Sequence, residues 1–115
     1  MRENDLLERT FKFGVKCLKM LKALPHTSEY QIIKYQLGKS ATSVGANYEE
    51  AQAGSSKADF KNKVRIALKE ARESNYWLRI LSELQDNPFE ELETLVQESK
   101  ELKNILASII NKLNQ

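Results

Sequence analysis

Residue types that carry chemistry are scarce in this chain. Its 115 residues include one cysteine and one histidine. A single cysteine excludes an internal disulfide, and so few cysteines and histidines offer none of the usual spacings for a bound metal. No metal and no other cofactor is therefore expected. Cys17 lies on an apolar stripe between Gly14 and Leu18, where a buried, unreactive thiol is expected.

Long hydrophobic runs and a strong charge of one sign are also lacking. No stretch approaches the roughly 18 apolar residues that a membrane span needs. The charged beginning, MRENDLLERT, does not resemble a secretory signal. These absences predict a cytoplasmic protein with no membrane partner. The formal net charge is only +2, from 18 basic and 16 acidic residues, so overall charge indicates no class of partner.

Breaks in the chain are few, because it has only four glycines and two prolines. The three clearest breaks are ALPHTSE, AGSSKAD and QDNPFEE. They leave four long segments, at roughly residues 3–24, 28–53, 56–86 and 88–113. Three N-terminal caps are expected at the breaks: Ser28 with Gln31, Ser56 with Asp59, and Asn87 ahead of Pro88.

Apolar residues recur every three or four positions in these segments, which indicates helices. In the first segment the main stripe is Leu7, Phe11, Gly14, Cys17, Leu18, Leu21 and Leu24, and a second set of Leu6, Phe13 and Met20 widens it. A helix with so wide an apolar arc is expected to be buried on more than one side. Short loops between long helices imply antiparallel neighbours. The sequence therefore predicts a single all-α domain, residues 1–115, folded as an antiparallel up-down-up-down four-helix bundle.

The second segment carries an unusual polar stripe. Its members share one helix face: Gln36, Ser40, Ser43, Asn47 and Glu50. On the third segment, Lys63 and Glu70 flank the predicted core face rather than opposing it. Partly buried charges need partners. We therefore predict a polar seam between these two helices, formed by Ser40, Ser43, Asn47, Glu50, Lys63 and Glu70.

Carboxylates of this kind also serve as catalytic acids or metal ligands, but that interpretation is weaker here. A carboxylate di-metal bundle uses Glu-x-x-His pairs, whereas the single histidine, His26, follows Pro25 in a predicted loop. A serine nucleophile needs a base, and no histidine lies near the seam. The chain also lacks a glycine-rich phosphate loop. No catalytic residue and no metal ligand is assigned, and an enzyme is not expected.

A longer pattern covers the second and third segments. It runs from a glutamine through Ser-x-x-Ser-x-x-x-Asn-x-x-Glu-Ala and a phenylalanine to Ile-Ala-x-x-Glu-Ala-x-Glu-x-x-x-Trp-Leu. The matching residues are Gln36, Ser40, Ser43, Asn47, Glu50, Ala51, Phe60, Ile66, Ala67, Glu70, Ala71, Glu73, Trp77 and Leu78. In this pattern the chain resembles the four-helix bundle proteins encoded in intervening sequences of large-subunit ribosomal RNA genes. The outer segments match only in length and periodicity, and Tyr48 stands where an aliphatic residue is expected.

The resemblance implies that such bundles assemble into a barrel-shaped homopentamer. It also implies a relation to the accessory protein of diversity-generating retroelements, which binds nucleic acid and a reverse transcriptase. A reverse transcriptase or another protein is therefore an expected partner. Because the function of most family members is unknown, the resemblance says more about fold and assembly than about activity.

Basic residues gather on the first and third segments. Residues 1–27 hold six basic and three acidic residues, and residues 57–72 hold six and two, whereas residues 88–113 hold three and five. Stripes of this kind suit the phosphate backbone of RNA or DNA. We expect no aromatic residue among them, hence no base stacking, and Tyr76 and Trp77 are assigned to a subunit interface in preference to ligand stacking. The residues predicted to bind nucleic acid are Lys12, Lys16, Lys19, Lys57, Lys61, Arg65, Lys69 and Arg72.

Two functions remain open at this point. The first is a non-enzymatic nucleic-acid-binding or scaffold protein that acts as a homo-oligomeric ring. The alternative is a protein–protein interaction module with no nucleic-acid role, in which the lysines only keep the surface solvated. Salt-dependent binding to RNA or DNA separates the two.

Overall fold

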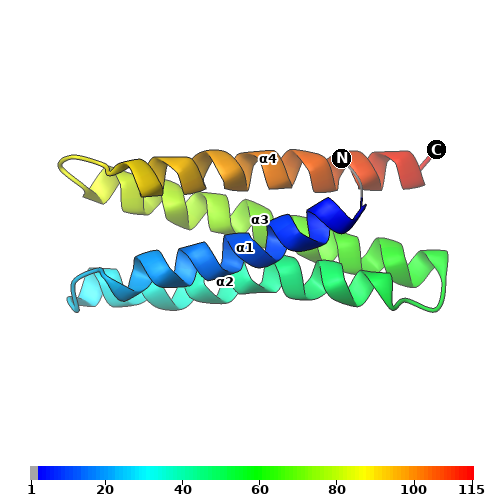
Figure 1. Ribbon diagram of the computed structural model, residues 1–115, viewed down its shortest axis with the longest axis horizontal. Helices are drawn as coiled ribbons and strands as arrows, with labels where there is room; N and C mark the ends of the chain where they lie inside the picture. Colours follow the sequence, from blue (N-terminus) through cyan, green and yellow to red (C-terminus); the bar gives the residue numbers. More distant parts are fainter. Residues whose placement is uncertain (1–2) are drawn as a thin grey trace.

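Four long helices make up most of the chain. The computed structural model describes the backbone of residues 3–115 and the side chains from Asp5 onward, so residues 1 and 2 of the predicted domain lie outside the described residues. The helices are α1 (Glu3–Lys22), α2 (Ser28–Gln52), α3 (Lys57–Leu84) and α4 (Glu90–Leu113). Successive helices run in opposite directions along a body of 45 × 20 × 20 Å (Figure 1). The predicted all-α up-down-up-down bundle is confirmed.

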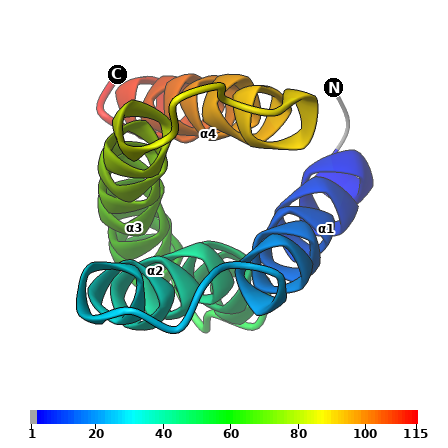
Figure 2. The same cartoon turned by 90° about the vertical axis from the view of Figure 1, so that its left-hand side faces the viewer.

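The helices stand at the corners of a square when they are viewed end-on (Figure 2). α2 packs against α1 and α3, and α4 packs against α3 and, less extensively, α1. α1 and α3 lie on a diagonal across the core and are not neighbouring helices (Figure 2). The outer surfaces of α1 and α3 consequently face opposite sides of the molecule.

The core is aliphatic, with two aromatic side chains, Phe13 and Tyr48, fully buried in it. Cys17 is also fully buried. Its burial raises the pKa of the thiol to about 12, so the group is protonated and unreactive at neutral pH, as expected for a structural cysteine. None of the four helices, as far as the chain is described, is long and apolar enough to cross a membrane.

α1 buries only part of its wide apolar arc: Cys17, Leu21 and Leu24 of the main stripe lie in the core. The second set, Leu6, Phe13 and Met20, points into the core. From the main stripe, Phe11 is 67% exposed and Leu18 is 47% exposed. A helix covered by only two neighbours cannot bury so wide an arc. The rest of the arc therefore stays on the surface of the single chain.

The backbones of α1 and α2 approach closely at Gly45. A Cβ atom placed there would lie 3.1 Å from the carbonyl oxygen of Thr10 and 3.2 Å from its carbonyl carbon. Both are main-chain atoms, which cannot move without shifting α1. At Gly38 the nearest atom would be Leu18 Cδ2 at 3.5 Å, an ordinary contact with a flexible side chain. The main chain of α1 therefore passes close to α2 at Gly45.

Alanine at these two glycines should have opposite effects on stability. Alanine is favoured over glycine in a helix interior by about 1 kcal/mol, whereas overpacking costs about 1–3 kcal/mol. Gly45→Ala is expected to lower the free energy of unfolding by about 1 kcal/mol, and Gly38→Ala to raise it by about 0.5–1 kcal/mol. Urea unfolding followed by circular dichroism measures both. Equal changes in the two variants would show that the contact with Thr10 is unimportant.

Helix starts agree with the sequence at α3 and differ at α2 and α4. Ser56 caps α3 as predicted, since its Oγ accepts a hydrogen bond from the amide of Asp59 (3.1 Å). The N-cap of α2 is Thr27, not Ser28, and that of α4 is Phe89, not Asn87, and neither makes a side-chain cap. In α4 three glutamates of the first turn offset the helix dipole instead.

Candidate functional site

The outer side of α3 carries a continuous row of cations. We call it the α3 band; its members are Lys57, Lys61, Arg65, Lys69 and Arg72. Lys61 is half-buried and the other four are exposed. None of the ion pairs found among residues 5–115 involves a member of the band. Their charge is therefore available to an external anion.

α4 extends this surface with two lysines that sequence analysis did not select. Glu98 and Glu101 of α4 turn toward Arg9 of α1, so the other flank of α4 adjoins α3. Lys100 and Lys103 follow Ser99, whose hydroxyl accepts a hydrogen bond from Asn75 of α3 (3.0 Å). At about 100° per residue both lysines fall on that flank. Because Lys100 and Lys103 are far from the α3 band in sequence, their proximity to it was not predicted.

The predicted basic residues of α1 do not join the α3 band. Lys12, Lys16 and Lys19 lie on the diagonally opposite helix (Figure 2). Lys12 Nζ is 3.0 Å from Glu8 Oε1. Lys16 lines a groove of about 500 Å³ between α1 and α4, together with four carboxylates, from Glu90, Glu93, Glu98 and Glu101. The field around α1 is thus much less positive than its lysine content implies.

Arg9 joins α1 to α4 at the edge of this groove. Its Nε donates to Glu98 Oε2 (2.9 Å) and its Nη2 to Glu98 Oε1 (2.6 Å) and Glu101 Oε1 (3.0 Å). The hydrogen bonds to Glu98 raise the already high pKa of Arg9. This cation therefore serves the packing of the bundle and is not free for a ligand.

The two aromatic residues assigned to an interface have different surroundings. Trp77 is half-buried against the core, and its Nε1 donates to Glu73 Oε2 (3.3 Å). Tyr76 is 49% exposed. It lies four residues after Arg72 and three before Arg79, on the outer side of α3, so the expectation of no aromatic residue among the basic stripes is wrong. The spacing of Tyr76 from Arg72 and Arg79 along the helix could have revealed this position from the sequence.

The polar seam between α2 and α3 forms in part. Ser40 is fully buried, and its Oγ accepts a hydrogen bond from Ser74 Oγ of α3 (3.0 Å). Ser74 was not among the predicted members of the seam. Glu50 and Lys63 make an ion pair (3.7 Å), but their side chains are 65% and 38% exposed, so it contributes little to stability.

The remaining predicted members of the seam do not bridge the two helices. Asn47 Nδ2 donates to the carbonyl oxygen of Ser43 within α2 (2.9 Å) instead of reaching α3. Burial and the neighbouring Glu73 raise the pKa of Glu70, although Lys69 and Lys39 oppose the shift. The seam is thus one buried hydroxyl pair and one exposed ion pair.

Glu70 should make the stability of the fold depend on pH. Its pKa is raised on folding above the ordinary value of 4.5, so the folded state holds the proton more tightly than the unfolded state. The carboxylate therefore destabilises the fold as the pH rises through 4.5 toward the raised folded value. Glu70→Gln is expected to melt at a higher temperature than wild type at pH 7 and at nearly the same temperature near pH 3.5. An equal difference at both pH values would contradict a titration of this group.

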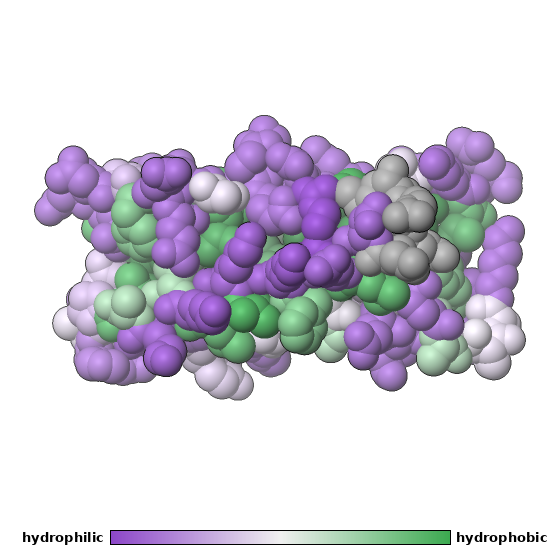
Figure 3. All heavy atoms as spheres, viewed as in Figure 1, coloured by the Kyte–Doolittle hydropathy of each residue, from purple (hydrophilic) through white to green (hydrophobic). Residues whose placement is uncertain are grey.

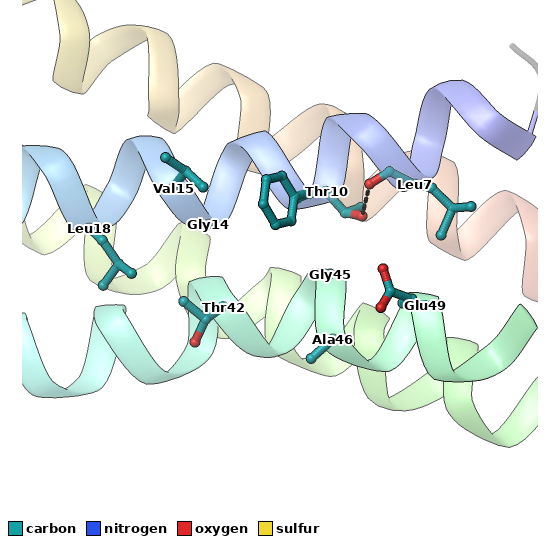
Figure 4. Close-up of a pocket in the computed structure, with 10 residues that line it drawn as sticks. Leu7, Thr10, Gly14, Val15, Leu18, Thr42, Gly45, Ala46 and Glu49 are labelled. Atoms are coloured by element: carbon teal, nitrogen blue, oxygen red, sulfur yellow. Dashed lines mark hydrogen bonds between the residues drawn. The ribbon is translucent and has the colours of Figure 1, made fainter. Parts of the chain in front are cut away.

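An apolar groove follows the line where α1 crosses α2. Hydrophobic atoms gather on the surface there (Figure 3), and the close-up shows Leu7, Val15 and Leu18 of α1 over Thr42, Gly45 and Ala46 of α2 (Figure 4). The cavity holds about 350 Å³, and Phe11 also lines it. Glu49 is the one charged side chain of its lining. The groove is built by the part of the α1 arc that the core does not bury.

Comparisons with known proteins agree on one family. Residues 2–108 match the model of the 23S rRNA-intervening sequence proteins. A crystal structure of a protein of unknown function from the S23 ribosomal protein family of Bacteroides thetaiotaomicron is 36% identical. It superposes with a TM-score of 0.82, and the match covers 91% of this chain and 97% of that one. No curated protein matches the chain.

Proposed function

Because the chain belongs to the 23S rRNA-intervening sequence protein family, we propose that it is a non-enzymatic nucleic-acid-binding scaffold that acts as a homo-oligomeric ring. The nucleic-acid-binding part of this proposal rests on the α3 band, whose five cations make no ion pair among the described residues. Residues 5–115 also contain no group of three or more potential metal ligands. We place the protein in the cytoplasm, with no membrane partner.

The α3 band has the dimensions of a short phosphate backbone. From Lys57 to Arg72 the helix rises about 22 Å. Phosphates of one strand in duplex DNA follow each other every 3.4 Å along the axis, so the band spans several of them. A straight row of cations on a rigid helix contacts phosphates and carries little sequence information. We therefore propose binding of RNA or DNA through the backbone.

Fluorescence anisotropy with short labelled RNA and DNA, across a salt series, tests this part of the proposal. If each subunit neutralises about five phosphates, log affinity should fall linearly with log salt with a slope of about −3.5 to −4.5. Absence of binding at low salt would remove the nucleic-acid role. The protein–protein interaction module would then be the better explanation, with the apolar groove between α1 and α2 receiving a reverse transcriptase or another protein.

The ring is proposed from apolar side chains that the single chain leaves exposed. The groove between α1 and α2 is one such surface. Ile32 and Tyr35, which are 57% and 66% exposed, add apolar surface near the start of α2. When the groove meets a different patch of the neighbouring chain, the contact is head-to-tail, and it closes into a ring where the rotation between neighbours closes and forms an open filament otherwise. A homopentamer, the assembly implied by the family resemblance, satisfies this geometry, and light scattering of the purified protein measures its mass.

A further inference from the structure

The end of the α3 band combines an exposed ring with two cations. Tyr76 lies between Arg72 and Arg79 on the outer side of α3. The guanidinium carbon of Arg79 is 6.0 Å from the centre of the Tyr76 ring. On its inner side, Tyr76 meets Trp77 edge-to-face, with ring centres 5.1 Å apart. Trp77 packs against the core, so the Tyr76 ring rests on a fixed support.

Arg79 is held in place by a chain of hydrogen bonds that reaches into the bundle. Its Nε donates to Asn75 Oδ1 (2.9 Å), and Asn75 Nδ2 donates to Ser99 Oγ of α4 (3.0 Å). Ser99 is fully buried and donates to the carbonyl oxygen of Val96 (2.7 Å). The terminal nitrogens of Arg79 make no ion pair among residues 5–115. The guanidinium is thus oriented by the protein while its outer edge stays free for a ligand.

A shallow hollow of about 280 Å³ adjoins the ring. Besides Tyr76 and Arg79 it is lined by Ile80, Glu83 and Leu84. Its walls are mainly the ring and aliphatic carbon, and the single carboxylate disfavours a phosphate inside it. A flat, uncharged heterocycle fits this lining, and a base amino group has Glu83 as an acceptor. Phosphates belong instead to the cations on either side.

We propose that Tyr76 is a stacking platform for an unpaired base, so that the α3 band selects single-stranded nucleic acid over a duplex. This inference rests on the proposed nucleic-acid role of the α3 band. An unpaired base stacks on the Tyr76 ring, Arg79 contacts the phosphate on one side of it, and Arg72 contacts the phosphate on the other. In a duplex the bases are paired and stacked on each other, so they cannot reach the ring. RNA and DNA share this chemistry, because every base has a π-face.

The experiment compares ligands that offer an unpaired base with ligands that do not. Anisotropy at one fixed salt concentration is measured with a 15-nucleotide oligo(dT), its RNA equivalent oligo(U), an abasic strand of the same length, and a 15-base-pair duplex. Wild type should bind oligo(dT) and oligo(U) at least about fivefold more tightly than the abasic strand, since stacking of one base on an aromatic side chain contributes this factor or more. Tyr76→Ala should remove that preference and leave duplex affinity unchanged. Tyr76→Phe keeps the ring and should bind like wild type.

Three other outcomes would overturn the stacking platform or the proposed function on which it rests. Equal binding of all four ligands by wild type, unchanged in Tyr76→Ala, would overturn the stacking platform and leave the proposed backbone binding intact. Failure of wild type to bind any ligand at low salt would overturn the proposed function itself. Loss of duplex binding in Tyr76→Ala together with a smaller mass by light scattering would show that Tyr76 is a subunit contact, which also overturns the inference.

Discussion

Replacing Lys61, Arg65 and Lys69 by glutamate is expected to lower nucleic-acid affinity by about 100-fold or more at moderate salt and to flatten its salt dependence. Each lost phosphate contact removes about one unit from the salt slope, and each new carboxylate repels the backbone. The slope should therefore fall by about two to three units. Anisotropy measures both quantities, and circular dichroism should show an unchanged fold, because these side chains lie on the outside of α3.

The matched control changes the net charge by the same amount on the opposite side of the bundle. Lys12, Lys16 and Lys19 of α1 are replaced by glutamate in a second variant. Lys12 and Lys16 already lie beside carboxylates, so affinity should fall by less than about tenfold. An equal fall in the two variants would mean that total charge, and not the α3 band, governs binding.

Placing charges in the apolar groove between α1 and α2 should break the ring into single chains. In the double variant Phe11→Glu, Leu18→Lys, the changed side chains are 67% and 47% exposed in the isolated chain. The stability of the single bundle should therefore change by only about 0.5 kcal/mol per site. In the ring the same residues would be buried, where each apolar side chain contributes about 1.5–3 kcal/mol. Light scattering should show the mass of one chain, 13.2 kDa.

Asn104→Glu is the control for this second prediction. It introduces a charge at an exposed position of α4, away from the groove. Its mass should equal that of wild type. If the double variant in the groove also keeps the wild-type mass, the groove is not a subunit contact and is open to a different protein.

The number, length and direction of the helices follow from local sequence. Sparse glycine and proline leave only three breaks, and an apolar residue every three or four positions is sufficient to indicate a helix. The cap at Ser56 was predictable because a cap involves residues only three positions apart. The pattern shared with the family lies within α2 and α3, so the fold was also accessible from resemblance. The exact starts of α2 and α4 could not be predicted from the sequence, because backbone geometry and several weak interactions compete there.

The tertiary structure alone decided which surfaces these helices share. Periodicity places residues on a helix but does not say which neighbour covers each side, so the exposure of Phe11 and Leu18 depended on where α2 and α4 lie. The two basic stripes look alike in sequence, yet the diagonal placement of α1 and α3 separates them, and α4 sets glutamates beside one and lysines beside the other. Charge and apolar pattern are local properties of a chain. Whether they add together or cancel depends on distances between helices, which only packing determines.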